Sequence, residues 1–331
     1  MLQSKLTHTL CVFVLTLFTA SSPVFAQESA PIRIGYWSSG FSLGFGAVLQ
    51  AEKFLEKEGL EVEFREFSEV SAPAKAVLTD SIDIAFGAPA AAAFNLASQG
   101  APVRVFLVTQ ILEGQFVVPT GSDVQSVEAL RGKRIGMSRP GSSTHALVTT
   151  ILDNNYDLAV NDYAIVPGNE GQLSQLLVRG DLDASSLRSV TIAQMPQDAV
   201  RPLFSIVEEW KKLTGDDTPP ALAVAMAQQD FLDANPDRMK NVVRAIRKAV
   251  KFGSDHPDAV AEILQDRANM EAGAARRYAA VWDKGYMASL SAADIAGLKR
   301  ENEIFVEAGA AEAMAPDALY VPGPYEAGTA Q

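Results

Sequence analysis

The stretch from residue 77 to residue 106, VLTDSIDIAFGAPAAAAFNLASQGAPVRVF, decides the fold. Residues 83–86 predict a short apolar strand, residues 89–98 a helix that ends at Gly100, and residues 103–110 a second strand. A helix that connects two strands is typical of a parallel sheet, because the chain must cross over before the next strand can start at the same edge. The stretch therefore predicts a fold of the α/β class.

The same alternation continues on both sides of this stretch. Strands are predicted at 32–36, 60–64, 134–137, 163–166, 183–186, 203–207 and 222–227, and helices at 47–57, 72–79, 143–154 and 171–178. From Asn235 onward the pattern is helical, with Asn235 as N-cap and Pro236 at the first helical position. We expect mainly parallel sheets with helices on both faces, followed by a helical C-terminal segment.

Length and composition limit the possible functions. The chain has 331 residues, and its 28 Lys and Arg against 40 Asp and Glu give a net charge of −12. This length suggests about two domains. An acidic protein is poorly suited to bind nucleic acid or anionic lipid, because both rely on Lys and Arg. The single cysteine, Cys11, excludes a disulfide within the chain, and three histidines leave little material for a metal site. We expect no nucleic-acid partner, no metal and no cofactor.

Residues 1–26 have the pattern of a secretory signal peptide. Lys5 is followed by an apolar run at 10–20 and by a small-x-Ala exit at 24–26. A membrane anchor would need about 20 apolar residues, and this run is shorter. We therefore expect cleavage of the signal and a periplasmic location for the remaining chain.

Several blocks of the sequence resemble one family of transport proteins. They are IRIGYWSS at 32–39, AEKFLEKEGLEVEF at 51–64, the opening stretch at 77–106, VEALRGKRIGMSRPGSSTHALV at 127–148 and AQQDFLDANPDRMKNVVRAI at 227–246. In their order and spacing, these blocks resemble the periplasmic solute-binding proteins of ABC importers. The similarity points to the branch that binds aliphatic sulfonates, taurine or nitrate, together with the related thiamin-precursor binders.

The resemblance implies a two-lobed periplasmic binding protein of type II. It places two chain crossings near 111–118 and 218–224 and a ligand cleft between the lobes. Residues 31–114 and 221–331 would form lobe 1, and residues 115–220 would form lobe 2. The implied protein is a monomer that captures a small organic anion (sulfonate-like, taurine-like or a carboxylate) by hinge closure and delivers it to an ABC permease. Nitrate and a thiamin pyrimidine precursor stay open as alternative ligands.

The ligand site is predicted from strand ends and helix starts. In open α/β sheets, ligands bind beyond the carboxyl ends of the strands. Helix N-termini at that edge offer free N–H groups, which favour an anion. The candidate ligand-binding residues are Trp37, Ser38, Ser39, Gly87, Ala88, Pro89, Gln110, Ser138, Ser142, Ser143, Thr144 and Arg188.

Several of these residues also have a purely structural interpretation. The hydroxyl-rich helix start at 142–144 could simply cap its helix. Arg188 could bind a sulfonate or carboxylate through two parallel hydrogen bonds, or it could form a surface salt bridge with Asp181 or Asp183. Trp37 could cover an apolar ligand tail or pack in the core. If Glu113 faces the cleft, an ammonium group on the ligand, as in taurine, becomes plausible.

Catalysis has little support in the sequence. There is no Walker, G-x-S-x-G or H-E-x-x-H pattern and no pair of cysteines. Ser142 and His145 lie within one helical turn, with no evident acid to orient the histidine, so they do not indicate a nucleophile and its base. We interpret His145 as a hydrogen-bonding residue at the helix start. We expect a binding protein, with an exported enzyme on the same fold as the alternative.

Overall fold

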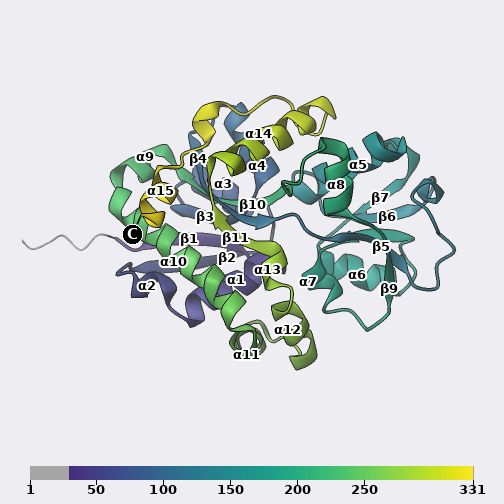
Figure 1. Ribbon diagram of the computed structural model, residues 1–331, viewed down its shortest axis with the longest axis horizontal. Coiled ribbons are helices and arrows are strands. Elements are labelled where there is room, and N and C mark those ends of the chain that lie inside the picture. Colours follow the sequence, from purple (N-terminus) through teal and green to yellow (C-terminus); the bar gives the residue numbers. More distant parts are fainter. Residues whose placement is uncertain (1–29, 331) are drawn as a thin grey trace, which may run out of the picture. The chain divides into compact units, whose positions relative to one another are not determined.

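The computed structural model describes residues 30–330, of which residues 31–330 belong to one compact unit. The predicted signal peptide at 1–26 lies outside the described residues. Within the described part of the chain, no helix is both long and apolar enough to cross a membrane. Two β-sheets, each accompanied by helices, make up the compact unit (Figure 1).

The first sheet has six strands in the order β11-β4-β10-β3-β1-β2. They are β1 Ile32–Trp37, β2 Val62–Phe67, β3 Ile84–Pro89, β4 Val103–Ile111, β10 Ala221–Gln228 and β11 Tyr286–Ser289. β1 pairs in parallel with β2 and β3, whereas β10 lies antiparallel between β3 and β4. The middle of this sheet is therefore completed by a strand that follows the whole second sheet in the sequence.

The second sheet has five strands in the order β7-β6-β8-β5-β9. They are β5 Gln115–Pro119, β6 Arg134–Met137, β7 Ala164–Pro167, β8 Ala184–Leu187 and β9 Val200–Ser205. β6 pairs in parallel with β7 and β8, and β5 pairs antiparallel with β8 and β9. Three of its strands thus run in the same direction and end at the same edge.

The chain passes between the sheets twice, once between β4 and β5 and once between β9 and β10. The α/β class and the two crossings are thereby confirmed. We call residues 31–114 with 221–330 the first half and residues 115–220 the second half. That these halves are the lobes of a hinge stays a prediction.

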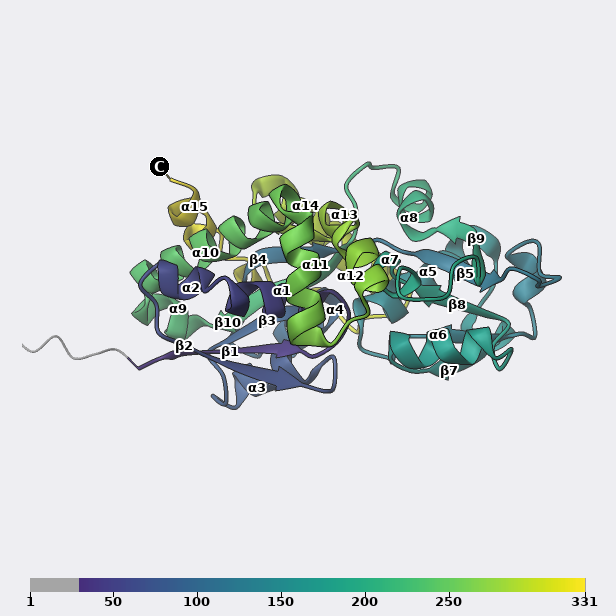
Figure 2. The same cartoon turned by 90° about the horizontal axis from the view of Figure 1, so that it is seen from below.

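Helices cover both faces of the first sheet, and Figure 2 shows α3 and α10 on opposite sides of β1. The helices of the first half are α1 Gly40–Ala51, α2 Phe54–Lys57, α3 Ala72–Leu78, α4 Ala90–Ser98, α9 Gln229–Ala234, α10 Pro236–Asp255, α11 Pro257–Ala268, α12 Ala272–Ala279, α13 Trp282–Gly285, α14 Ala292–Glu307 and α15 Gly323–Thr329, with a 3₁₀ turn at Asp317–Leu319. Those of the second half are α5 Ser143–Tyr156, α6 Glu170–Val178, α7 Ser189–Ile192 and α8 Ile206–Thr214, with 3₁₀ turns at Glu128–Leu130 and Val160–Asp162.

The sequence prediction missed α7 and α8, and the strand predicted at 203–207 is wrong at its end, because α8 begins at Ile206. Two further elements differ from the prediction. The first helix begins at Gly40 and not at residue 47, because Phe41, Phe45 and Val48 are buried on one face. Their spacing is helical, but it lies in a segment rich in glycine and serine, which favours a loop. The second is β11, a strand of four residues inside the segment predicted to be helical. β11 depends on pairing with β4 at the edge of the sheet and not on a pattern of its own.

Candidate functional site

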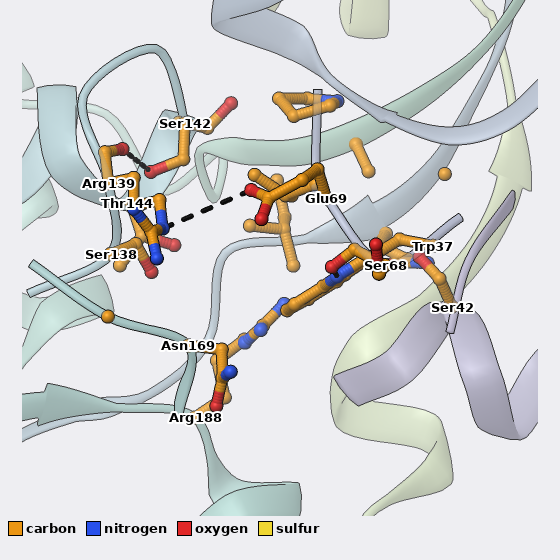
Figure 3. A pocket seen from close by; sticks show the side chains of 18 residues that line it. Trp37, Ser42, Ser68, Glu69, Ser138, Arg139, Ser142, Thr144, Asn169 and Arg188 are labelled. Carbon is orange, nitrogen blue, oxygen red and sulfur yellow. Dashed lines mark hydrogen bonds and ion pairs between the residues drawn. The ribbon is translucent and has the colours of Figure 1, made fainter. Parts of the chain in front are cut away.

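One cavity lies where strands of both sheets end. It has a volume of about 60 Å³. Its lining includes the last residues of β1 and β3 and the residues that follow β2, β6, β7 and β8. Side chains of the two halves face it from different sides (Figure 3). The carboxyl ends of parallel strands from both sheets therefore meet around one small space, as expected for this fold class.

The structure brings most of the predicted site residues to this cavity. Those that line it are Trp37, Gly87, Pro89, Gln110, Ser138, Ser142, Ser143, Thr144 and Arg188. The other three lie elsewhere. The backbone N–H and the hydroxyl of Ser38 both donate to the carbonyl of Phe67, Ser39 lines a different cavity, and Ala88 is fully buried in β3 against β10.

Other residues of the lining were missed by the sequence prediction. They are Ser42, Ser68, Glu69, Val70, Arg139, Gly168, Asn169, Leu222 and Ala223. Most of them follow a strand, so the strand-end rule could have found them if it had been applied to β2 and β7 as well and to the second residue after β6. Ser42 was missed because its helix begins earlier than predicted.

Arg188 lies inside the protein and not on its surface. Its Nε is 2.5 Å from Oε1 of Glu170, and its guanidinium carbon is 5.5 Å from the centre of the Trp37 ring. Figure 3 shows Arg188 and Trp37 at the cavity. The predicted alternative, a surface salt bridge with Asp181 or Asp183, is wrong, because these residues pair with Arg179 and Arg134. The two terminal nitrogens of Arg188 have no hydrogen-bond acceptor among the described residues. They are free to bind a ligand in the cavity.

Two buried carboxyl groups hold the first turn of α7 behind the cavity. Glu170 accepts hydrogen bonds from the backbone and Nε of Arg188 and from the hydroxyl of Thr191. Glu113 accepts from the backbone N–H of Ser189, at 3.0 Å, and from its hydroxyl. Burial raises the pKa of the Glu113 carboxyl. Glu113 does not line the cavity, so the structure does not support the expectation that this carboxylate binds an ammonium group of the ligand.

Helices from both halves begin at the cavity. Pro89 precedes α4, and the side chains of Ser142 and Asn169 cap α5 and α6 by accepting from the N–H groups of His145 and Gln172. Ser142 is thus an N-cap that also lines the cavity. The hydroxyl of Ser143 accepts from the N–H of Ala91, 3.1 Å away, and so links α5 to α4. The starts of three helices bring positive partial charge to one place.

The N–H groups at the start of α5 are available to a ligand. Those of Ser143 and Thr144 have no acceptor among the described residues. In an α-helix the first N–H groups have no partner within the helix, so a bound anion can accept hydrogen bonds from them.

A close approach of side chains forms another part of the wall. Nε2 of Gln110 lies 3.3 Å from the hydroxyl oxygen of Ser42, and Gln110 is buried. Gly87 beside them has a φ of 69°, and a Cβ atom there would lie 2.5 Å from the Ser42 hydroxyl oxygen. Position 87 therefore requires glycine both for its backbone and for the space that this contact occupies.

The side chains and backbone groups that line the cavity are mainly hydrogen-bond donors and acceptors, and few of them are nucleophiles or general bases. Its residues include no His, Cys or Lys. His145 lines a different cavity, where its Nδ1 is 3.2 Å from the Ser138 carbonyl oxygen, and burial lowers its pKa. The interpretation of His145 as a hydrogen-bonding residue at the helix start is confirmed. Across residues 30–330, no group of three or more His, Cys, Asp or Glu is placed to hold a metal ion.

Two α/β sheets joined by two crossings, with a cavity where their strands end, define the fold class of the periplasmic binding proteins. Residues 47–260 match the family model described as NMT1/THI5 like, and the chain belongs to this family.

Individual relatives agree with this class. A candidate binding protein of Brucella abortus (strain 2308) is 21% identical over 249 residues, which are 74% of this chain and 75% of the relative. The alkanesulfonate-binding protein SsuA from Xanthomonas axonopodis pv. citri, bound to MOPS, is similar with a TM-score of 0.75 and 18% identity, over 89% of this chain and 99% of that chain. The periplasmic aliphatic sulphonate binding protein SsuA from Escherichia coli is similar with a TM-score of 0.70 and 17% identity, over 87% of this chain and 90% of that chain.

One enzyme shares the fold. The desulfurization enzyme DSZB is similar with a TM-score of 0.62 and 14% identity, over 89% of this chain and 98% of that chain. At these identities the solved structures show the fold alone. The chain thus has the fold of the solute-binding proteins of ABC importers, and the ligand must be argued from the cavity.

Proposed function

We propose that this protein is the extracytoplasmic solute-binding component of an ABC importer and that its ligand is a small organic anion. The observation that carries the proposal is the meeting of the starts of α4, α5 and α6 with the free terminal nitrogens of Arg188 around one cavity. Helix N-termini favour a negative charge, and a guanidinium group binds a sulfonate or carboxylate through two parallel hydrogen bonds.

The size of the cavity favours a small ligand. A cavity needs about 10–15 Å³ to hold one water molecule. The volume of about 60 Å³ therefore corresponds to a few water molecules. A sulfonate or carboxylate head with a short chain fits this space better than a large aromatic ligand does.

Contacts between the halves support hinge closure as the mechanism of capture. Besides the link between Ser143 and Ala91, Nε of Arg277 in the first half donates to the carbonyl of Ala193 in the second half, at 2.5 Å. A ligand held by residues of both halves adds to these contacts and so stabilises the closed state. A permease that recognises the closed state would then receive only loaded protein. Delivery to such a permease, a monomeric state and export to the periplasm through the signal at 1–26 belong to the same proposal.

A binding assay with several ligand classes tests the proposal. The melting temperature of the purified protein is measured with ethanesulfonate, taurine, acetate, nitrate and an aminopyrimidine, because a ligand that binds only the folded protein raises it. We expect the sulfonate or the carboxylate to give the largest increase. A response to nitrate or to the pyrimidine alone would support the alternative ligands, and no response to any of them would contradict the proposal.

The enzyme alternative is tested on the same samples. We propose that the bound compound leaves the protein unchanged, since no His, Cys or Lys lines the cavity. Mass spectrometry after prolonged incubation should recover the ligand intact. A chemically altered product that forms only with protein present would show catalysis instead.

A further inference from the structure

The charged side chains around the cavity balance each other. Those that line it within the described chain are Glu69, Arg139 and Arg188. Glu69 and Arg139 form an ion pair between the two halves, with 3.9 Å between Oε2 and Nε, and both are largely exposed. Arg188 has Glu170 at 2.5 Å. Two positive and two negative side chains therefore leave the cavity without a net formal charge.

The neutralisation of Arg188 is built into the fold. Glu170 is buried and fixed by three donors, two of which belong to Arg188 itself, so the carboxylate cannot turn away when a ligand enters. A second buried carboxyl group, Glu113, also interacts with the charge of Arg188. Besides Arg188 and the ion-paired Arg139, no cationic side chain lines the cavity in the part of the chain that the structure describes.

The positive potential left for a ligand comes from backbone N–H groups. Each helix start contributes about half an elementary charge, and this contribution fades within the first turn. Such partial charges, together with the donors of Arg188, can balance one delocalised negative charge. A second negative charge would enter this small cavity without a counter-ion of its own, and an uncompensated charge beside the buried pair of Arg188 and Glu170 is costly.

We propose that this site selects its ligand by charge, accepting organic anions that carry one negative charge and rejecting dianions of similar size. The inference rests on the proposed function and narrows the ligand class to sulfonates and carboxylates, with phosphate monoesters excluded in their doubly charged form.

Two probes of similar size test this selection. Ethanesulfonate carries one charge at all working pH values, whereas ethyl phosphate loses its second proton with a pKa near 6. Calorimetric affinities are measured for both between pH 5.5 and pH 8. We expect the affinity for ethyl phosphate to fall at least about tenfold over this range, while that for ethanesulfonate changes less than about twofold. A constant ratio of the two affinities would overturn the inference.

Two matched variants test the origin of the selection. Glu170→Gln leaves the charge of Arg188 unbalanced and should raise the affinity for the dianion relative to ethanesulfonate by about tenfold at pH 8. Glu209→Gln is the control, because Glu209 is an equally buried, ion-paired carboxylate of the second half that does not line the cavity. An unchanged ratio in Glu170→Gln would overturn the charge-balance explanation, and the wild-type pH series decides the selection itself if this variant does not fold.

The failure of the proposed function has a different signature. If neither probe binds at millimolar concentration, capture of small organic anions is wrong, and the inference falls with it. If both probes bind with equal affinity at pH 8, only the inference is overturned.

Discussion

Nε of Arg188 lies 2.5 Å from Oε1 of Glu170, and the two side chains are only 6% and 2% exposed. A buried ion pair of this kind contributes little net stability, because both charges lose their hydration. The pair does fix the orientation of the Arg188 guanidinium group. With Nε held by Glu170 and the guanidinium carbon over the Trp37 ring, 5.5 Å from its centre, the terminal nitrogens are oriented before a ligand arrives. Orientation in advance reduces the entropy that binding must overcome.

Replacement of Arg188 should remove most of the affinity for organic anions. Hydrogen bonds to charged groups contribute about 1.5–3 kcal/mol, so we expect Arg188→Ala to weaken ethanesulfonate binding about 10- to 100-fold in calorimetry. Arg179→Ala is the control, since Arg179 forms an exposed ion pair with Asp181 in the same half. Because Arg188→Ala also leaves Glu170 without its partner, the double variant Arg188→Met, Glu170→Met should show the same loss of binding with better stability. Affinity within twofold of wild type would contradict the role of Arg188.

Substitution of Gly87 should affect both stability and binding. Gly87→Ala forces a side chain into the left-handed region and toward the Ser42 hydroxyl, so we expect a loss of about 1–3 kcal/mol and a weaker affinity. Gly100→Ala is the matched control, because Gly100 also has a positive φ, of 85°, but has nothing within 4 Å of a Cβ atom. Chemical denaturation and calorimetry should therefore show destabilisation in both variants and loss of binding only in Gly87→Ala. If Gly87→Ala bound the ligand as tightly as wild type does, the contact with Ser42 would not contribute to the binding site.

Loss of the Ser143 hydroxyl should favour the open state. Ser143→Ala leaves the buried N–H of Ala91 without its acceptor when the halves are closed, at a cost of about 1–3 kcal/mol. We expect weaker ligand binding and a larger radius of gyration of the ligand-free protein in small-angle X-ray scattering. Ser98→Ala is the control, because the Ser98 hydroxyl bonds only to the Asn95 carbonyl within the same helix region. A ligand-free radius equal to that of wild type, and no decrease on saturation of wild type, would argue against hinge closure.

Stability should fall as the pH rises, in part because of Glu301. Burial raises the pKa of this carboxyl group to about 8, and its Oε2 accepts from the N–H of Ala221, where the chain enters β10. The folded state thus keeps a proton that the unfolded state loses near pH 4.5. The stabilisation is complete below that pH and is lost progressively up to about pH 8.

Glu301→Gln tests this assignment. It cannot ionise, so denaturation midpoints measured at pH 5 and pH 8 should differ less in the variant than in wild type. Glu303→Gln removes an exposed, ion-paired carboxylate of the same helix and should keep the wild-type difference. An identical pH dependence in Glu301→Gln and wild type would contradict the assignment.

The sequence predicted the order of most strands and helices because those elements have local patterns of their own, whereas α7, α8 and β11 were missed. It also predicted much of the site, since strand ends and helix starts are visible without knowledge of packing. Leu222 and Ala223 could not be found in this way. β10 runs antiparallel to β3, so the beginning of β10, and not its end, lies beside Pro89 at the cavity. Strand direction is a property of the assembled sheet.

The partner of Arg188 could not be predicted from the sequence either. Asp181 and Asp183 are nearer in sequence, but Glu170 lies at the start of α6, and the packing of α6 against β8 decides which carboxylate meets the guanidinium. The charge balance of the site therefore depends on tertiary structure, although every residue in it can be read from the chain.

The place of β10 in the first sheet has a consequence for biosynthesis. β3 and β4 do not form a continuous ladder until β10 is inserted between them, and β10 emerges from the ribosome only after all five strands of the second sheet. The first sheet therefore cannot be completed before β10 has been synthesised, and its central contacts are long in range and slow to form. Until then, the edges of β3 and β4 that pair with β10 have no ladder partner, and unpaired strand edges are prone to pair with other chains.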